Sequence, residues 1–372
     1  MKIICSKTNL LKSVNISLKA VPAKTTMPIL ECILIDARTN QIKFISNDME
    51  LGIETIVEGT IAQKGTIAIN AKIFYEIIRR LPDNEVTLQT DERYTVTITC
   101  EKSKFNIPGK PGDDFASLPV IEKKEALVIS QYSLKEMIRQ TIFSIAVNEN
   151  NKLMTGELFE ISNNYLKVVS LDGHRISIRK IELKGNYTDR KVVVPGKTLN
   201  EISKILSGEL TDEVHIFFSK NHILFSFDNT VVISRLIEGE YFRINQMLSS
   251  DYETKFEINK KEFLNCIDRA TLLVREGDKR PIIIQITDSK MELKIESSIG
   301  SMKEDIDIVK EGKDILIGFN PKFLIDALKV IDDETITIYM VNSKAPCFIR
   351  DTRESYTYLI LPVNFNQYSQ AR

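Results

Sequence analysis

The sequence predicts an α+β protein built from three consecutive repeats of one fold. Three segments about 125 residues apart each combine a short apolar strand, a helix start, an amphipathic helix, a loop and an alternating strand. Three further helices, one ahead of each of these segments, complete the pattern. Each repeat would then hold two helices and roughly eight strands, so we expect helices packed on β-sheets in every repeat.

The helices that open the repeats begin near residues 6, 130 and 259. Their apolar positions correspond between copies, at Leu10, Leu134 and Phe263 and again at Val14, Ile138 and Ile267. This shared spacing is typical of one buried helix face.

The second helices follow the apolar strands that begin near residues 66, 191 and 314. Each carries three apolar positions spaced by three and four residues, which places them on one stripe of the helix. The three sets are Phe74, Ile77 and Leu81; Leu199, Ile202 and Leu206; and Leu324, Ala327 and Ile331.

Polar and charged stretches at 120–127 and 247–256 separate the repeats. We therefore predict three domains, comprising residues 1–124, 125–249 and 250–372.

Composition narrows the class of protein. The chain has 372 residues, 43% hydrophobic and 27% charged, without an apolar run long enough to span a membrane. Its N-terminus is interrupted by lysines, unlike a signal peptide, so a cytoplasmic location is expected. Five cysteines are scattered singly without a CxxC pair, which argues against a disulfide framework or a zinc site.

Positive charge follows the repeat although the net charge is only −1. Two positions seven residues apart are basic in each second helix, namely Lys72 and Arg79, Lys197 and Lys204, and Lys322 and Lys329. Each pair lies on one side of its helix, away from the apolar stripe. A solvated helix face is the simple explanation, but three aligned copies favour sequence-independent binding of duplex DNA through its phosphates.

The stretch "SLDGHRIS" (170–177) concentrates Asp172, His174 and Arg175 and raises the question of catalysis. The chain lacks GxxxxGK[ST], GxGxxG, HExxH and GxSxG, and no cluster of metal ligands is evident. We therefore predict no catalytic residue, no cofactor and no metal. An acid–base or phosphate-handling site, a simple turn with a capping aspartate, and a monomeric three-repeat scaffold remain alternatives.

In combination, the three repeats, "TTMPIL" (25–30), "SLDGHRIS" and "YLILPV" (358–363) resemble the bacterial DNA polymerase III beta subunits, the sliding clamps, over residues 1–364. The resemblance implies a non-enzymatic processivity factor in which two chains join head to tail into a six-domain ring. Helices would line the central hole and strands would lie outside. Implied partners are duplex DNA, the polymerase III alpha subunit, other proteins with a clamp-binding motif, the clamp loader and a second copy of the chain, without a membrane.

The resemblance also assigns sites by position. A pocket for partner peptides would comprise Met154, Leu171, His174, Arg175, Ile176, Phe242, Gln246, Met247, Leu359, Leu361 and Val363. For DNA, the resemblance adds the loop residues Lys24 and Asn148 to the helix cations, which are Lys72, Arg79, Arg80, Lys197, Lys204, Lys322 and Lys329. The dimer interface would bring Phe105 and Ile107 against Leu272 and Leu273. Phe242 replaces a proline usual in the family, and Asn364 an arginine, so the peptide preference is left open.

Overall fold

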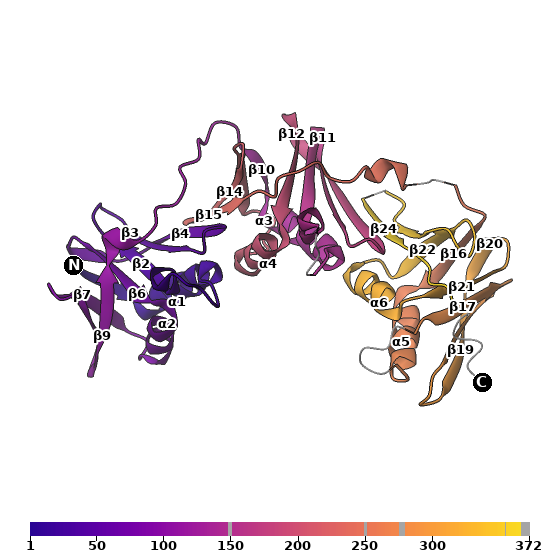
Figure 1. The fold of residues 1–372 in the computed structure, drawn as a ribbon, viewed down its shortest axis with the longest axis horizontal. Coiled ribbons are helices and arrows are strands. Elements are labelled where there is room, and N and C mark those ends of the chain that lie inside the picture. The colour runs from indigo at the N-terminus through magenta and orange to yellow at the C-terminus, as the bar shows by residue number, and fades with distance from the viewer. Residues whose placement is uncertain (148–150, 249–250, 275–279, 354, 366–372) are drawn as a thin grey trace. The chain divides into compact units, whose positions relative to one another are not determined.

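The computed structural model describes residues 1–147, 151–248, 251–274, 280–353 and 355–365 (Figure 1). The chain divides into two compact units. Unit 1 comprises Met1–Lys135 and Lys197–Leu236, and unit 2 comprises Glu136–Gly196 and Ile237–Arg372. The second predicted repeat therefore contributes to both units.

Six α-helices occur in the described part of the chain, at the places the repeat predicts. They are α1 (Lys7–Ser17), α2 (Ala71–Arg80), α3 (Gln131–Thr141), α4 (Gly196–Ile205), α5 (Lys260–Thr271) and α6 (Pro321–Val330). Helices α1 and α2 lie side by side in unit 1, and α5 and α6 do so in unit 2 (Figure 1). Asparagine side chains cap two equivalent helices: the Asn70 oxygen accepts from the Ile73 amide, and the Asn320 oxygen from the Lys322 amide.

Unit 1 contains one thirteen-stranded antiparallel sheet. In sheet order its strands are β10 (Leu127–Ser130), β13 (Glu213–Phe218), β14 (His222–Phe227), β15 (Thr230–Arg235), β4 (Leu51–Val57), β3 (Ile42–Asn47), β2 (Cys32–Asp36), β6 (Thr66–Asn70), β9 (Ser103–Pro111), β8 (Thr95–Cys100), β7 (Glu85–Thr90), β1 (Lys2–Ser6) and β5 (Thr60–Gln63). The β15–β4 pair joins the second predicted repeat to the first.

Unit 2 contains two sheets. The seven-stranded sheet runs β11 (Gly156–Leu171), β12 (Arg175–Pro195), β24 (Tyr356–Ile360), β23 (Cys347–Arg350), β22 (Thr335–Met340), β16 (Thr254–Asn259) and β20 (Val309–Gly312). The four-stranded sheet runs β19 (Ser301–Asp307), β18 (Lys290–Glu296), β17 (Ile282–Thr287) and β21 (Ile315–Phe319). Here the β12–β24 pair joins the third repeat to the second.

The predicted helix faces are buried as the spacing required. All six apolar positions of the first helices, and Phe74, Leu199 and Leu324 of the second, are at most 1% exposed. Full burial of such a side chain stabilises the fold by about 1.5–3 kcal/mol. Ile77 departs from the prediction because it is only half-buried, and its neighbour Ile78 takes the core position.

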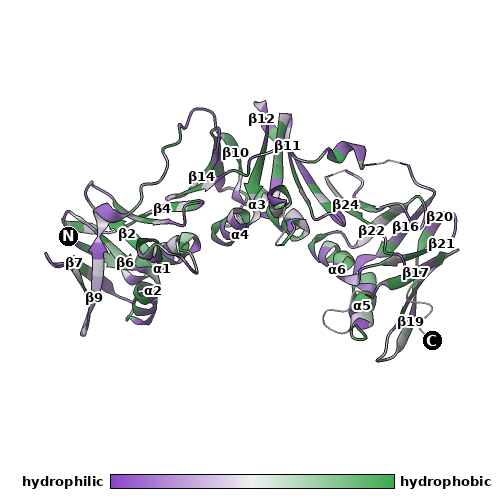
Figure 2. Cartoon of the chain, viewed as in Figure 1, coloured by the Kyte–Doolittle hydropathy of each residue, from purple (hydrophilic) through white to green (hydrophobic). Residues whose placement is uncertain are grey.

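Leu81, Leu206 and Ile331 are buried but lie one residue beyond their helices, where the chain turns. Figure 2 shows hydrophobic and hydrophilic residues mixed along the helices and strands, as expected for elements with one buried face. Among the described residues, no helix has the length and apolar character needed to cross a membrane.

Candidate functional site

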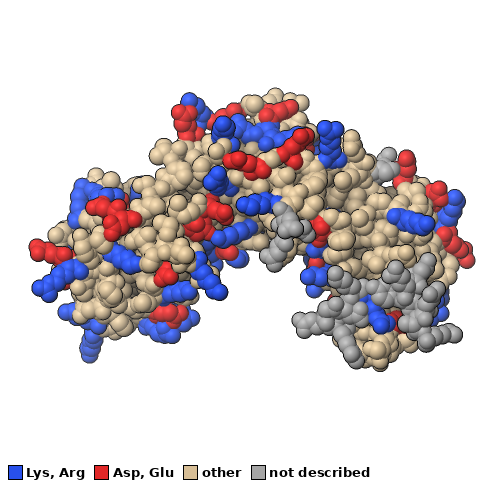
Figure 3. All heavy atoms as spheres, viewed as in Figure 1, with Lys and Arg blue, Asp and Glu red and all other residues tan. Residues whose placement is uncertain are grey.

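The basic positions of the second helices all reach solvent. Exposed side chains are found at every described residue predicted to contact DNA: Lys24, Lys72, Arg79, Arg80, Lys197, Lys204, Lys322 and Lys329. Asn148 lies outside the described residues. Figure 3 shows lysines and arginines interspersed with acids on the visible face.

An acid three residues before the second cation recurs at the repeat spacing, as Glu76, Glu201 and Asp326. In α2 the Glu76 carboxylate pairs with both Arg79 and Arg80. In α4 the Glu201 carboxylate lies 2.7 Å from Lys204 Nζ. The basic positions alone do not predict this acid, but its own 125-residue spacing in the sequence does.

Asp326 behaves differently, because its carboxylate pairs with Arg175 instead of a cation on α6. Lys322 and Lys329 accordingly have no acidic partner within 4 Å among the described residues. In unit 1, Lys197 is paired with Asp48, whereas Lys72 has no such partner in the described part of the chain. The available positive charge is therefore greatest at Lys72 and on α6.

The turn Asp172–Arg175 joins strands β11 and β12. Asp172 Oδ1 accepts hydrogen bonds from the amides of His174 and Arg175 at 3.0 and 3.1 Å. Gly173 has a φ of +84°, in the left-handed region that favours glycine. Asp172 and Gly173 thus shape a tight turn, in line with the capping alternative considered from the sequence.

Arg175 is buried inside unit 2. Its side chain is 8% exposed and donates to Asp172 Oδ2 at 2.9 Å, to Asp326 Oδ2 at 2.7 Å and to the Phe143 carbonyl at 2.6 Å. The guanidinium also lies 4.6 Å from the ring centroid of Phe323 and 5.4 Å from that of Phe143. This arrangement ties the turn to α6.

His174 is exposed, and its ring stacks on Phe323 at 5.9 Å between centroids. The described residues hold no group of three or more His, Cys, Asp or Glu side chains that could hold a metal ion. The nearby Asp172 carboxylate is engaged by Arg175 and by the amides of the turn.

An apolar cluster lies beside this turn and contains most of the predicted peptide-binding residues. Leu171, Ile176 and Leu359 are buried in it, and the partly buried Met154, Phe242 and Leu361 pack against it. The strand register explains this gathering, because Leu171 pairs with Ile176, and Ile176 with Leu359. The amide of Leu361 then donates to the His174 carbonyl at 2.9 Å.

Three predicted pocket residues, Gln246, Met247 and Val363, are not themselves members of this cluster. Gln246 and Met247 are exposed and lie in the chain between Ile244 and Leu248, which belong to it, and Met247 has 49% of its surface accessible. The Val363 amide donates to the Gly318 carbonyl, which directs the chain toward β21. The cluster also contains residues that sequence reasoning missed, including Leu158, Ile178, Val193, Tyr241 and Phe348. Alternation along the β11 and β12 segments could have identified Ile178.

The predicted interface residues divide into exposed and packed ones. Phe105 is 40% exposed and Leu272 is 77% exposed. Ile107 and Leu273 are partly buried against the cores of the first and third repeats. In unit 1, Phe105 also borders an apolar hollow of ≈ 350 Å³ together with Lys72, Ile73, Glu76, Ile77 and Arg80.

Comparisons with known proteins agree with this organisation. Three family models match in succession, described as the DNA polymerase III beta subunit N-terminal domain (1–119), central domain (128–242) and C-terminal domain (245–364). A Staphylococcus aureus protein named beta sliding clamp is 34% identical over 98% of this chain and 99% of its own length.

Solved structures show the same similarity. A chain from Eubacterium rectale assigned as a DNA polymerase III beta subunit is 68% identical, with a TM-score of 0.96 over 98% of this chain and all of its own. A DNA polymerase sliding clamp from Bacillus subtilis is 34% identical, with a TM-score of 0.94 over 98% of this chain and 99% of its own.

Proposed function

Because this chain belongs to the DNA polymerase III beta subunit family, the sliding clamps, we propose that two copies close head to tail around duplex DNA. The chain is a DNA sliding clamp, a non-catalytic processivity factor. The proposal concerns how it assembles, which residues face DNA and where partner proteins bind. Such a clamp would work in the cytoplasm.

The ring is supported by a strand junction that occurs twice between consecutive repeats, and by two further strands that could form it a third time between two chains. Each repeat contains a hairpin, β3–β4, β11–β12 or β18–β19. The second strand of the first two hairpins is covered by the last strand of the next repeat, β15 on β4 and β24 on β12. In the third hairpin, β19 is a sheet edge, and the last strand of the first repeat, β9, pairs along residues 103–108 only with β8.

Pairing β9 of one copy with β19 of the other would repeat the same junction a third time and leave neither edge free. Apolar side chains support this contact. We infer that Leu272 of one copy enters the hollow beside Phe105 and Ile73 of the other, since all three are substantially exposed in the single chain. Ile107 and Leu273 would support the contact from the two cores.

We infer that DNA is held by phosphate contacts from the exposed cations of α2, α4 and α6, together with Lys24. Acidic neighbours at Glu76 and Glu201 would keep several of these contacts weak, which suits a protein that must slide. Asn148 remains part of this proposal on the family resemblance alone.

Partner proteins would dock on the apolar cluster of Met154, Leu171, Ile176, Phe242, Leu359 and Leu361, bordered by His174. A mixed surface of methionine, aliphatic and aromatic side chains suits short peptides with apolar anchors. The polymerase III alpha subunit, the clamp loader and other proteins with a clamp-binding motif are the proposed users. Arg175 would act from beneath by fixing the turn, and Gln246, Met247 and Val363 would extend the surface.

The ring is tested by the mass of the protein in solution. Light scattering should give the dimer mass for the unaltered chain and the monomer mass for Leu272→Asp, because a buried carboxylate would face an apolar hollow. Val309→Asp is the matched control, since Val309 is 70% exposed and lies outside the proposed contact. A Leu272→Asp variant that keeps the dimer mass would remove this interface.

A further inference from the structure

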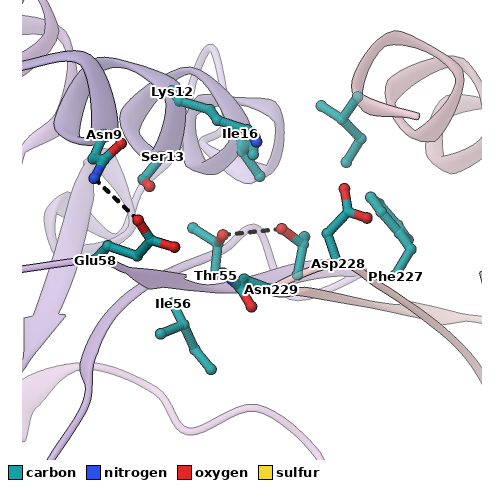
Figure 4. Close-up of a pocket in the computed structure, with 12 residues that line it drawn as sticks. Asn9, Lys12, Ser13, Ile16, Thr55, Ile56, Glu58, Phe227, Asp228 and Asn229 are labelled. Carbon is teal, nitrogen blue, oxygen red and sulfur yellow. Dashed lines mark hydrogen bonds between the residues drawn. The ribbon is translucent and has the colours of Figure 1, made fainter. Parts of the chain in front are cut away.

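A polar hollow of ≈ 150 Å³ lies in unit 1 where the second repeat joins the first (Figure 4). Its walls come from α1, strand β4, the end of α4 and the turn between β14 and β15. The hollow is distinct from the proposed DNA-facing cations, the peptide-binding cluster and the dimer contact, and none of those functions explains it.

Two carboxylates mark opposite ends of the hollow. Figure 4 shows Glu58 at one end and Asp228 at the other, with the hydrogen-bonded Thr55–Thr230 pair between them. Each acid has one amide donor, Asn9 Nδ2 at 3.4 Å from Glu58 and Gln131 Nε2 at 3.2 Å from Asp228. Within the described residues neither carboxylate has a basic partner within 4 Å, so both keep unused acceptor positions and negative charge.

A serine side chain between these ends has no hydrogen-bond partner among the described residues. Ser13 is only 5% exposed, and its side chain makes no hydrogen bond to any described residue. Its oxygen points into the hollow in Figure 4. Because the Ser13 oxygen is open to the hollow, its lone pairs are available to a donor that enters from outside the chain. The Thr55–Thr230 pair uses one of its two hydroxyl protons internally and leaves the other available.

The rest of the lining combines the apolar Ile16, Ile56, Ile205 and Phe227 with the polar Lys12 and Asn229. Carboxylates at both ends, hydrogen-bonding groups between them and aliphatic walls match a short chain with a positive charge at each end. We propose that the hollow binds an aliphatic diammonium ion, with one ammonium at Glu58, the other at Asp228 and the methylenes against the isoleucines. The proposal does not depend on the ring or on peptide binding.

The probe is 1,4-diaminobutane, titrated at constant ionic strength into full-length protein carrying labelled isoleucine methyl groups. Shifts should concentrate on Ile16, Ile56 and Ile205, with a Kd on the order of 1 mM. Butylamine, which has one ammonium, should bind about tenfold more weakly, a difference of one charge contact. The neutral 1,4-butanediol should give no shift at these methyls.

Substitutions at the two carboxylates distinguish this site from non-specific attraction of the amines to acidic side chains. Glu58→Gln and Asp228→Asn should each reduce the affinity for the diamine to that for butylamine. Glu92→Gln, at an exposed acid in the β7–β8 turn, should leave it unchanged. Lys12→Met should bind as tightly or more tightly, because the Lys12 ammonium at the same hollow repels a cation.

Equal affinities for diamine and butylamine would overturn the two-ended site. Shifts that persist in both Glu58→Gln and Asp228→Asn would overturn it as well. Methyl signals outside the hollow report whether each variant is folded, so a loss of binding with those signals unchanged supports the proposal.

Discussion

Equivalent positions in α4 and α6 have different partners, although the two helices occupy the same place in their repeats. In unit 1 the Glu201 carboxylate pairs with Lys204 on its own helix. In unit 2 the matching Asp326 pairs with Arg175 of the β11–β12 turn, and Lys329 is left without an acidic partner among the described residues. The repeat therefore fixes where the acid lies, while a residue from another element decides which charge it neutralises.

The two strand junctions differ in the same way. Thr230 pairs with Thr55 at the β15–β4 junction, and Tyr356 pairs with Arg179 at the corresponding register of the β24–β12 junction. The two threonine hydroxyls bond to each other, at 2.9 Å, and to no other side chain among the described residues, beside the hollow of Figure 4. Arg179 instead bonds to Ser355, and Tyr356 to Asp333 at 2.8 Å. The same backbone junction therefore leaves a hollow where its side chains are small threonines, whereas the larger arginine and tyrosine fill that space.

A third contrast involves a buried acid. The register places Ile33 opposite Ile69, Glu157 opposite Val194, and Ile282 opposite Phe319, so these three residues are equivalent. All three are completely buried, but both Glu157 oxygens lack a hydrogen-bond partner among the described residues. Burial raises the pKa of Glu157 from 4.5 to about 8.

The largest effect is expected from replacing Glu157 by isoleucine, the residue at the equivalent position of the other two repeats. Between pH 4.5 and about 8 the folded state holds a proton on Glu157 that the unfolded chain has released, so stability falls as pH rises through this window. Glu157→Ile should abolish that fall and stabilise the protein by about 4 kcal/mol at pH 9. Urea denaturation followed by circular dichroism across this pH range measures both effects.

Glu157→Gln serves as the control, because it removes the ionisation and keeps a polar group. It should flatten the pH dependence while gaining less stability than Glu157→Ile. A wild-type stability that stays level from pH 5 to about 8 would show that Glu157 is hydrated or paired in solution.

The second effect tests whether Arg175 organises the turn from beneath. Arg175→Ala would leave Asp172 and Asp326 without their shared cation, which should destabilise the protein by about 3 kcal/mol. It should also weaken a fluorescent clamp-binding peptide, measured by anisotropy at a temperature where the variant is folded. Arg353→Ala, at an exposed arginine of the same unit, is the matched control.

A lysine variant separates a positioning role of Arg175 from direct contact with the peptide. Arg175→Lys keeps the charge but loses the planar fork that reaches Asp172, Asp326 and the Phe143 carbonyl, so it should restore only part of the peptide affinity. Full affinity in Arg175→Ala would mean that the turn holds its shape without this network.

Features that depend on local spacing could be predicted from the sequence, whereas features that depend on distant segments could not. Helix positions, the buried faces and the exposed cations depend on local spacing, and all were predictable, apart from the exchange of Ile77 for Ile78. Predicting the peptide pocket and the dimer interface relied on family resemblance, and the burial of Arg175 could not be predicted from its neighbours in the sequence. Its burial depends on Phe143, Phe323 and Asp326, which come from two distant segments. The domain boundaries at 124 and 249 remain predictions.

The smallest effect concerns DNA and returns to α4 and α6. A cation that binds a phosphate releases about one counterion, so its removal should reduce the salt dependence of binding by about 0.9 in the log–log slope. Lys329→Ala should approach this value because no described acid neutralises Lys329. Lys204→Ala should change the slope by less, since Lys204 is already paired with Glu201 at 2.7 Å.

The two slopes are measured by the fluorescence anisotropy of a labelled duplex over a series of salt concentrations. Lys344→Ala, in the exposed turn between β22 and β23, sets the baseline. Glu201→Gln should bring the contribution of Lys204 up to that of Lys329, because it removes the competing carboxylate while keeping the helix. Equal slope changes for Lys329→Ala and Lys204→Ala in the unaltered background would show that the acid partner does not set how strongly a cation holds DNA.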